Sequence, residues 1–391
     1  MPFIGIGIRH NLLYPSTYLC FIFLSRAIRI ILEEVVGYNA KFILAILMIL
    51  PNSIFSYIFL YFLDRKKETK IKNKSLMRYS LIQNEKRSIN MLDDLRKILL
   101  LIIICSYFNF IDSISREFLG LLDNRFKIRI RIIEILIASI FCHFTINIKI
   151  YKHHKFSLII ISIFLIINML FELFIYITDD KFKIEDFLIF LGISFVNGIC
   201  RVFADTIEKY LFEYNYLNPF KLLKFEGIFE IVFILIMSFF KGLNEFKELS
   251  KLNDKIIYAI ILLSLHFIFS GFKNIYKIHT IRLYSPMTRA LADAFIDPFI
   301  IIYEFIVHKS SQGNLLDYLY VCVNIICSII TIFFSLVYNE FLIIYSCGLE
   351  LETHKEIFKR AIINNYEYNN DNYIIIWVKK ILIYYIFLLF I

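Results

Sequence analysis

The sequence predicts an all-α integral membrane protein, with ten transmembrane helices that form two inverted five-helix repeats. Three observations predict this fold class: the composition, apolar runs long enough to cross a bilayer, and basic clusters between those runs. Hydrophobic residues make up 59% of the 391 residues and charged residues 20%, whereas soluble domains average about 45–50% apolar and about 25% charged residues. This composition excludes a soluble globular protein.

Two charge-free apolar runs anchor the assignment of helices. The ranges 42–63 and 318–339 contain no Asp, Glu, Lys or Arg, and each is long enough to cross a hydrocarbon core of about 30 Å at about 1.5 Å per residue. Other apolar stretches of similar length include a few ionisable residues. The sequence therefore predicts helices at 11–34, 41–63, 97–121, 131–149, 156–178, 186–213, 223–241, 255–277, 286–308 and 317–341.

The number of helices predicts the domain organisation. Ten helices divide into two sets of five, so we expect a first repeat at 1–180 and a second at 181–345. Because five is odd, the second set must enter the membrane in the opposite orientation, as in many secondary transporters. The range 346–391 is then a cytosolic tail. Its apolar end, 373–391, is broken by two lysines and is interpreted as an interfacial helix, with an eleventh crossing as the alternative.

Basic residues between the helices predict the orientation. The loop 64–97 holds the densest cluster of Lys and Arg in the chain, which places it and the N-terminus in the cytosol. Ten crossings then return the C-terminus to the cytosol. A further basic loop with Lys273, Lys277 and Arg282 falls on the same side. The cluster at 125–131 does not fit this pattern and is interpreted as lying partly inside the fourth helix.

Ionisable residues inside the predicted helices are the candidates for a functional site. A charge at the bilayer centre costs at least a few kcal/mol, so such residues usually face the bundle interior and pair with one another. Arg289, Asp293 and Asp297 follow one another at intervals of four residues and share one helix face. They are either structural ion pairs or part of a polar central cavity that binds a solute. Similar candidates are Arg26, Arg29, Glu33, Glu34, Asp112, Arg116, Glu117, Arg131, Glu134, Arg201, Asp205, Glu226 and Glu230.

Several other functions lack the residues that they need. His143 and His266 lie inside helices, and His153 and His154 lie in a short loop; neither pair has a third ligand at useful spacing. We therefore expect no metal and no cofactor. The chain has no GxSxG, P-loop or HExxH motif and only short non-cytosolic loops, so we expect no enzyme. The net charge of +9 comes from the basic loops, so we expect no nucleic-acid partner.

Two stretches resemble a known family. The range 205–229 reads DTIEKYLFEYNYLNPFKLLKFEGIF, and the range 285–293 reads SPMTRALAD, followed by YNE at 338–340 and by GL with a later Thr353. They resemble motifs of the drug/metabolite transporter superfamily, which is EamA-like, and within it the eukaryotic branch that contains nucleotide-sugar transporters and other members of solute carrier family 35. Together they span roughly 150 residues, mainly in the second half. Glu230 departs from the pattern, because the family usually has a small or apolar residue there.

The resemblance implies a multi-pass secondary transporter that moves a small anionic metabolite, such as a nucleotide sugar or another phosphorylated solute, by alternating access. Arg289 and Arg131 would bind the anionic group, because a guanidinium forms bidentate bonds to phosphate or carboxylate. Asp293 would orient Arg289 from one turn away. Glu226 and Asp112 would line the site or couple protons.

The expected partners are the small-molecule substrate and the lipid bilayer, and a homodimer stays open. The eukaryotic branch implies an endomembrane of the Golgi, endoplasmic reticulum or vacuole type rather than the plasma membrane. Two alternatives from other classes remain at this point. One is a non-transporting membrane scaffold that uses the basic loop 64–97 as its partner or lipid surface. The other is a membrane-embedded lipid-modifying enzyme.

Overall fold

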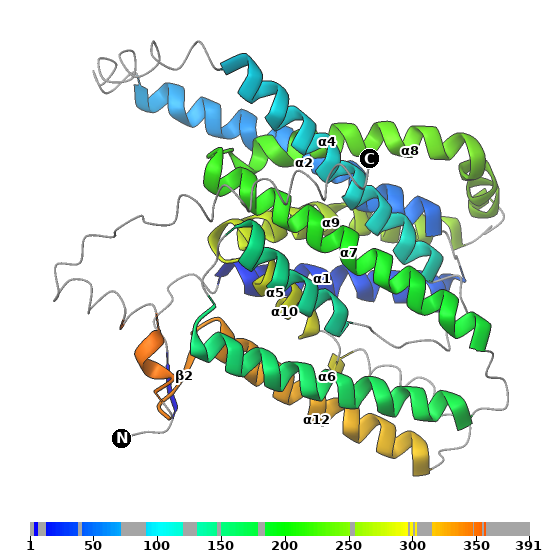
Figure 1. Cartoon of the computed structure of the whole chain (residues 1–391). Helices are drawn as coiled ribbons and strands as arrows, with labels where there is room; N and C mark the ends of the chain where they lie inside the picture. Colours follow the sequence, from blue (N-terminus) through cyan, green and yellow to red (C-terminus); the bar gives the residue numbers. More distant parts are fainter. Residues whose placement is uncertain are drawn as a thin grey trace. The chain divides into compact units, whose positions relative to one another are not determined.

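A computed structural model of the chain describes residues 4–6, 13–37, 41–71, 91–119, 131–146, 150–178, 184–250, 255–295, 298–299, 302, 315–346, 348–353 and 356 (Figure 1). These residues are almost entirely helical. Much of the predicted basic loop, the predicted cluster at 125–129 and the predicted apolar end at 373–391 lie outside this described part.

Each of the ten predicted helices corresponds to an α-helix among the described residues. This agreement follows from the apolar runs, because a backbone inside lipid must satisfy its hydrogen bonds within its own helix. The helices are α1 (Leu13–Ile31), which continues as a π-helix (Leu32–Val36), α2 (Lys41–Ile71), α4 (Met91–Leu119), α5 (Arg131–Thr145), α6 (Lys152–Thr178), α7 (Ile184–Tyr214), α8 (Pro219–Ser250), α9 (Ile256–Leu283), α10 (Pro286–Ala294) and α12 (Leu315–Tyr338).

Five helices are long and apolar enough to cross a membrane. By length and composition, the spans within the described residues are Ile46–Leu63, Arg96–Ile114, Lys152–Phe171, Ile256–Leu283 and Val321–Tyr338. The protein is therefore helical and membrane-embedded. The full number of ten crossings and their arrangement as inverted repeats stay predictions.

Two helix ends differ from the prediction in ways that affect the site. Helix α9 continues to Leu283, so Lys277 lies inside a helix and not in the basic loop where the sequence pattern placed it. Helix α10 ends at Ala294, well before the predicted end at 308. Further along the predicted range, Pro298, Phe299 and Ile302 are again helical. Asp297 lies outside the described residues.

Contacts divide the chain into two units, and each unit contains helices from both halves of the sequence. Unit 1 comprises Met1–Leu12, Lys127–Phe187 and Ser285–Ile391, and unit 2 comprises Leu13–Phe126 and Leu188–Tyr284. In unit 1, α5 packs on α10, α6 on α12, α5 on α6 and α10 on α12 (Figure 1). In unit 2, α1 packs on α9, α2 on α8, α9 and α4, and α8 on α4 and α9.

A short antiparallel pair of strands in unit 1 was not predicted. Strand β1 (Ile4–Ile6) pairs with β2 (Leu342–Ile344), with Ile4 opposite Ile344. Three residues are too few to show the alternation by which a strand is recognised in a sequence. The pair joins the N-terminal residues to the segment that follows α12.

Helix α2 is held against two neighbours by glycines. A Cβ added at Gly227 of α8 would lie 2.5 Å from the backbone nitrogen of Ser53, and one at Gly271 of α9 would lie 2.8 Å from the ring of Phe55. Real Cβ atoms do not approach other atoms so closely, so these two positions need glycine for the observed helix packing. The close approach places α2 beside the polar residues of α8 and α9.

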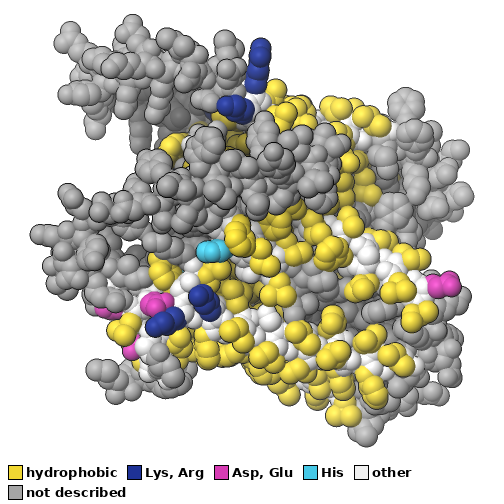
Figure 2. Space-filling view, in the orientation of Figure 1, with side chains coloured by type: hydrophobic (Ala, Val, Ile, Leu, Met, Phe, Trp, Pro, Cys, Tyr) yellow, Lys and Arg dark blue, Asp and Glu magenta, His cyan; other side chains and the backbone are white. Residues whose placement is uncertain are grey.

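The outward faces of α6 and α12 are apolar. Ile159 and Leu170 of α6 are 60% and 54% exposed, and Ile326 and Ile329 of α12 are 56% and 57% exposed. Figure 2 shows yellow hydrophobic side chains over this part of the surface. Exposed apolar surface on this scale disfavours contact with water and is typical of a lipid-facing protein.

Candidate functional site

The loop before α10 positions Arg289 through a helix cap. Ser285 is the N-cap of α10, and its Oγ accepts a hydrogen bond from the backbone nitrogen of Thr288 at 3.1 Å, with Pro286 in the first turn. This is a favourable start for a helix. The hydroxyl of Thr288 donates to Oδ1 of Asn339 at 2.6 Å, which ties α10 to the end of α12. Two parts of the second resembling stretch, at 285–293 and 338–340, therefore meet here in structural contacts.

Arg289 is completely buried and lies between two carboxylates. Its Nη2 donates to Oε1 of Glu134 from α5 at 2.5 Å, and its Nη1 donates to Oδ2 of Asp293, one turn along α10, at 3.0 Å. Both terminal nitrogens of the guanidinium therefore have acidic partners. The predicted pairing of Arg289 with Asp293 is present, and Glu134 joins it. Because the guanidinium is fully buried as well as paired, an incoming anion has no open access to it, so these contacts favour a structural role for Arg289.

A second polar cluster of unit 1 joins the start of α6 to the end of α12. Nε2 of His153 lies 3.2 Å from Oε1 of Glu340, at an angle outside hydrogen-bond geometry. The ring of His154 packs on His153, and its Nδ1 accepts a hydrogen bond from the backbone nitrogen of Tyr151. Because that Nδ1 is an acceptor, neutral His154 carries its proton on Nε2, which makes the ring a poor metal ligand in this arrangement.

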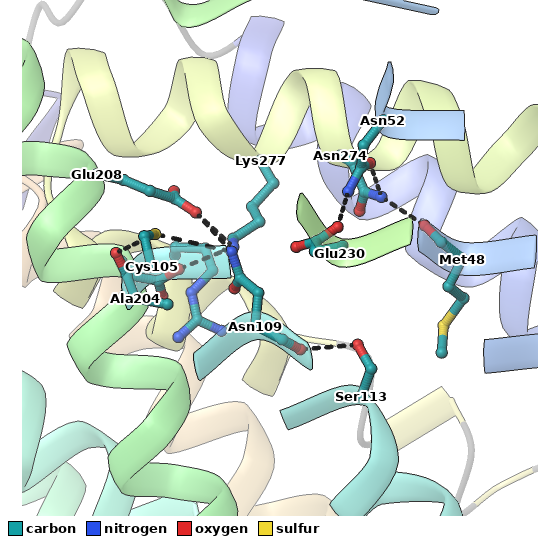
Figure 3. Close-up of polar contacts among 12 residues, drawn as sticks. Met48, Asn52, Cys105, Asn109, Ser113, Ala204, Glu208, Glu230, Asn274 and Lys277 are labelled. Atoms are coloured by element: carbon teal, nitrogen blue, oxygen red, sulfur yellow. Dashed lines mark hydrogen bonds and ion pairs between the residues drawn. The ribbon is translucent and has the colours of Figure 1, made fainter. Parts of the chain in front are cut away.

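In unit 2, Lys277 lies at the centre of a network of ionisable side chains (Figure 3). Its Nζ lies 3.0 Å from Oδ1 of Asp205 and 3.1 Å from Oε1 of Glu208, both on α7. Asp205 and Glu208 are buried, while the side chain of Lys277 keeps 18% of its surface exposed. Asn109 of α4 adds a longer bond to Glu208 at 3.5 Å. Residues of three helices thus take part in this network.

A second group of polar residues, with Asn274 on the same helix as Lys277, extends towards α2. Nδ2 of Asn52 donates to Oε2 of Glu230 at 3.0 Å, and Nδ2 of Asn274 donates to Oδ1 of Asn52 and to the carbonyl oxygen of Met48 (Figure 3). Glu230, which departs from the pattern of the resembling family, is buried. The hydrogen bond from Asn52 offsets part of the cost of burying its carboxyl group. The network therefore includes residues of α2, α4, α7, α8 and α9.

Glu226 lies beside Glu208 and Cys105 in the interior of unit 2. One ligand atom from each of these three residues lies within 4.8 Å of the others, and all three residues are buried. The Sγ of Cys105 donates to the carbonyl oxygen of Ala204 at 3.4 Å, which links α4 to α7 (Figure 3). Among the described residues, Oε1 of Glu226 and Oε2 of Glu208 have no hydrogen-bond partner.

The predicted site residues fall into both units. Arg289 and Asp293 contact each other in unit 1, whereas Glu226 and Asp112 are buried in unit 2, where the backbone oxygen of Asp112 accepts a hydrogen bond from Asn197 of α7. Arg131 is the first residue of α5, and its side chain lies outside the described part. The assignment of these five residues to substrate binding stays a prediction.

Sequence reasoning missed the central role of Lys277. Its position near the end of a predicted helix made it look like a residue of a basic loop, because hydropathy alone cannot separate a buried lysine from one that reaches the headgroups. Lys273 and Lys277 are four residues apart, so they share one face if the helix extends past 277. This interval could have indicated that Lys277 lies inside the helix. Glu340 was missed as a partner of His153 because it lies far along the sequence.

Comparisons with protein-family models and with curated proteins find no match. The resemblance to drug/metabolite transporters therefore rests on the motifs alone, and function must be argued from the geometry of the site.

Proposed function

We propose that this chain is a multi-pass secondary transporter that moves a small anionic solute across a membrane by alternating access, with Lys277 as the residue that binds the charge of the solute. The observation that carries the proposal is the buried network around Lys277. Ionisable groups inside a membrane protein are costly and usually mark a substrate, ion or proton pathway. Here one ammonium group, two ion-paired carboxylates and several amides converge from different helices.

The choice of Lys277 over Arg289 rests on accessibility and on the surrounding groups. The side chain of Arg289 is fully buried, whereas that of Lys277 is partly exposed. Protonation of Glu208 would weaken its attraction for Lys277 and leave the ammonium group to an incoming anion. The solute anion would then replace the Glu208 carboxylate as the partner of Lys277. Proton binding at Glu208 and solute binding at Lys277 would thereby be coupled. The alternative within this proposal is that Arg289 and Arg131, and not Lys277, bind the solute.

The pattern of helix contacts supports two five-helix repeats. If α1, α2, α4, α5 and α6 exchange places with α7, α8, α9, α10 and α12, most of the observed contacts map onto one another. The contact of α2 with α9 becomes that of α8 with α4, and the contact of α5 with α6 becomes that of α10 with α12. The contact of α1 with α9 would become one of α7 with α4, two helices that are joined by the bond from Cys105 to Ala204. Such an exchange is expected for repeats at 1–180 and 181–345.

Solute uptake into proteoliposomes tests the proposal. Purified protein is assayed with nucleotides, nucleotide sugars, phosphorylated metabolites and neutral solutes, and the wild type is compared with Lys277→Met. The exposed Lys221 of α8 supplies the matched control, Lys221→Met. We expect uptake of an anionic solute that is lost in Lys277→Met and kept in Lys221→Met.

Each other outcome has a definite meaning. Full uptake by a folded Lys277→Met variant together with loss in Arg289→Ala would move the solute site to unit 1. Uptake of none of the solutes, in liposomes that contain folded protein, would count against transport and favour the membrane scaffold. Release of a modified lipid from the bilayer would instead favour the enzyme.

A further inference from the structure

We propose that Cys105, Glu208 and Glu226 bind a divalent transition-metal cation, and that Zn²⁺ fits this donor set best. The three residues come from α4, α7 and α8 and meet in the interior of unit 2. Their ligand atoms lie within 4.8 Å of one another, so they surround a volume that suits a single ion rather than an organic solute. The inference concerns binding and does not depend on transport.

Two buried carboxylate oxygens in this cluster have no hydrogen-bond partner among the described residues. They are Oε1 of Glu226 and Oε2 of Glu208, and each residue is 1% exposed. A buried polar atom without a partner costs roughly 1–3 kcal/mol, and more when it is charged. A cation between the two carboxylates would satisfy both oxygens together. The other oxygen of Glu208 already faces Lys277 and Asn109.

The charges around the cluster favour a bound cation. Asp205, Glu208 and Glu226 supply three carboxylates, and Lys277 supplies the ammonium group that pairs with two of them. In the ionised state, these four groups carry an excess of two negative charges, and a Cys105 thiolate would add a third, so a bound dication would offset most of the negative charge. Glu230, on the same face of α8 one turn away, has its own amide partner in Asn52.

The thiol distinguishes a transition metal from a hard cation. Ca²⁺ and Mg²⁺ prefer oxygen ligands, whereas Zn²⁺ binds thiolate sulfur at about 2.3 Å and carboxylate oxygen at about 2.0–2.2 Å. Cys105 would lose its thiol proton to the solvent and give up its bond to Ala204 when the metal binds, so binding releases one proton from sulfur. Asn109, whose Nδ2 lies 3.9 Å from Sγ, is placed to donate to the thiolate.

Equilibrium dialysis and absorption spectroscopy of the full chain in detergent test the proposal. We expect one equivalent of Zn²⁺ per chain, and with Co²⁺ a sulfur-to-metal charge-transfer band in the near ultraviolet. Cys105→Ser should abolish the band, and the isosteric Glu226→Gln should weaken Zn²⁺ binding at least tenfold. Glu226→Gln also keeps the test available if Cys105→Ser fails to fold.

Two matched controls locate the metal. Cys200→Ser removes another buried cysteine, from α7, and should leave the band and the affinity unchanged. His153→Ala disrupts the His153, His154 and Glu340 group of unit 1 and should also leave them unchanged. The proposal is overturned if the wild type binds no stoichiometric Zn²⁺, if the Co²⁺ band survives in Cys105→Ser, or if His153→Ala removes binding. Solute uptake is measured separately, so failure of one proposal does not decide the other.

Discussion

Arg289 is a buried charge that forms ion pairs with two carboxylates of the fold. Its guanidinium joins Glu134 of α5 to Asp293 of its own helix. Loss of the cation would leave two carboxylates close together in the protein interior, where each needs a counter-charge. At this position the contacts explain why an arginine lies in an apolar chain.

Arg289→Ala should therefore lower the free energy of unfolding by about 3–5 kcal/mol, because the two buried carboxylates lose their partner. Thermal unfolding of the purified protein in detergent measures the loss. A triple variant with Arg289→Met, Glu134→Gln and Asp293→Asn should recover part of it, since no charge then remains unpartnered. A loss below about 1 kcal/mol, typical of exposed ion pairs, would contradict the buried role.

Glu208 should control how tightly a solute binds at Lys277. Glu208→Gln keeps the shape of the side chain but removes the charge that pairs with the ammonium group. If Lys277 binds the anion, we expect a lower KM for uptake in this variant, because the solute no longer competes with a carboxylate. Uptake kinetics in proteoliposomes provide the measurement, with Glu213→Gln as the control, since Glu213 is exposed and pairs with Lys209. An unchanged KM would argue against Lys277 as the solute ligand.

At the scale of the helix, the packing of α2 on α8 depends on a missing side chain. Gly227→Ala would place a Cβ against the backbone of Ser53, and overpacking of this kind costs about 1–3 kcal/mol. Helix propensity alone favours Ala over Gly by about 1 kcal/mol, so a net loss of stability would have to come from the contact. We expect a lower midpoint of thermal unfolding for Gly227→Ala.

Gly192→Ala is the matched control for this helix contact. Gly192 also lies inside a helix, α7, but an added Cβ would meet nothing within 4 Å among the described residues. Its substitution should leave the midpoint unchanged or raise it. Equal effects of the two substitutions would show that backbone propensity and not the contact with α2 sets the outcome.

The segment after α12 contacts the start of α6 through Glu352. The backbone nitrogen of Lys152 donates to its Oε2 at 2.7 Å, and this bond, with the nearby charge of Lys152, holds the pKa of Glu352 below its usual value. A lowered pKa in the folded state means that the contact stabilises the fold above the unfolded pKa and is lost as the pH falls through the folded pKa. The dependence therefore lies on the acidic side of about pH 4.5.

Hydrogen exchange can measure this contact. The protection factor of the Lys152 amide should fall as the pH drops below about 4.5, because the protonated carboxyl is a weaker acceptor. Glu352→Gln should show low protection that does not depend on pH over the same range. Constant protection in the wild type would mean that the amide is protected by something other than the carboxylate.

At the scale of the whole molecule, an even number of crossings places both termini on one side of the membrane. Ten crossings and the basic loop at 64–97 predict a cytosolic N-terminus and a cytosolic C-terminus. Tags at the two ends should both be digested by a protease added to the cytosolic face of sealed vesicles. Digestion of one tag alone would require an odd number of crossings, as in the alternative with an eleventh span.

The sequence predicted the helices well and the site only in part. Hydropathy located each described helix because the requirement for internal hydrogen bonding in lipid acts locally, on residues that are neighbours in the chain. The pair Arg289 and Asp293 was predictable for the same reason, since four residues make one helical turn. Glu134 was recognised as an intramembrane charge, but its partner could not be deduced from spacing.

The sequence by itself determined that this is a helical membrane protein and which residues carry charge inside its helices. The tertiary structure decided which of those charges meet. Arg289 and Glu134 are 155 residues apart, and Lys277 and Glu208 are 69 residues apart. Ionisable residues in an apolar interior tend to form ion pairs, but this tendency is the same for every possible partner in the chain. The partners are determined by how helices that are distant in the sequence pack together. This packing places Glu208 and Asp205 next to Lys277, and Glu134 next to Arg289.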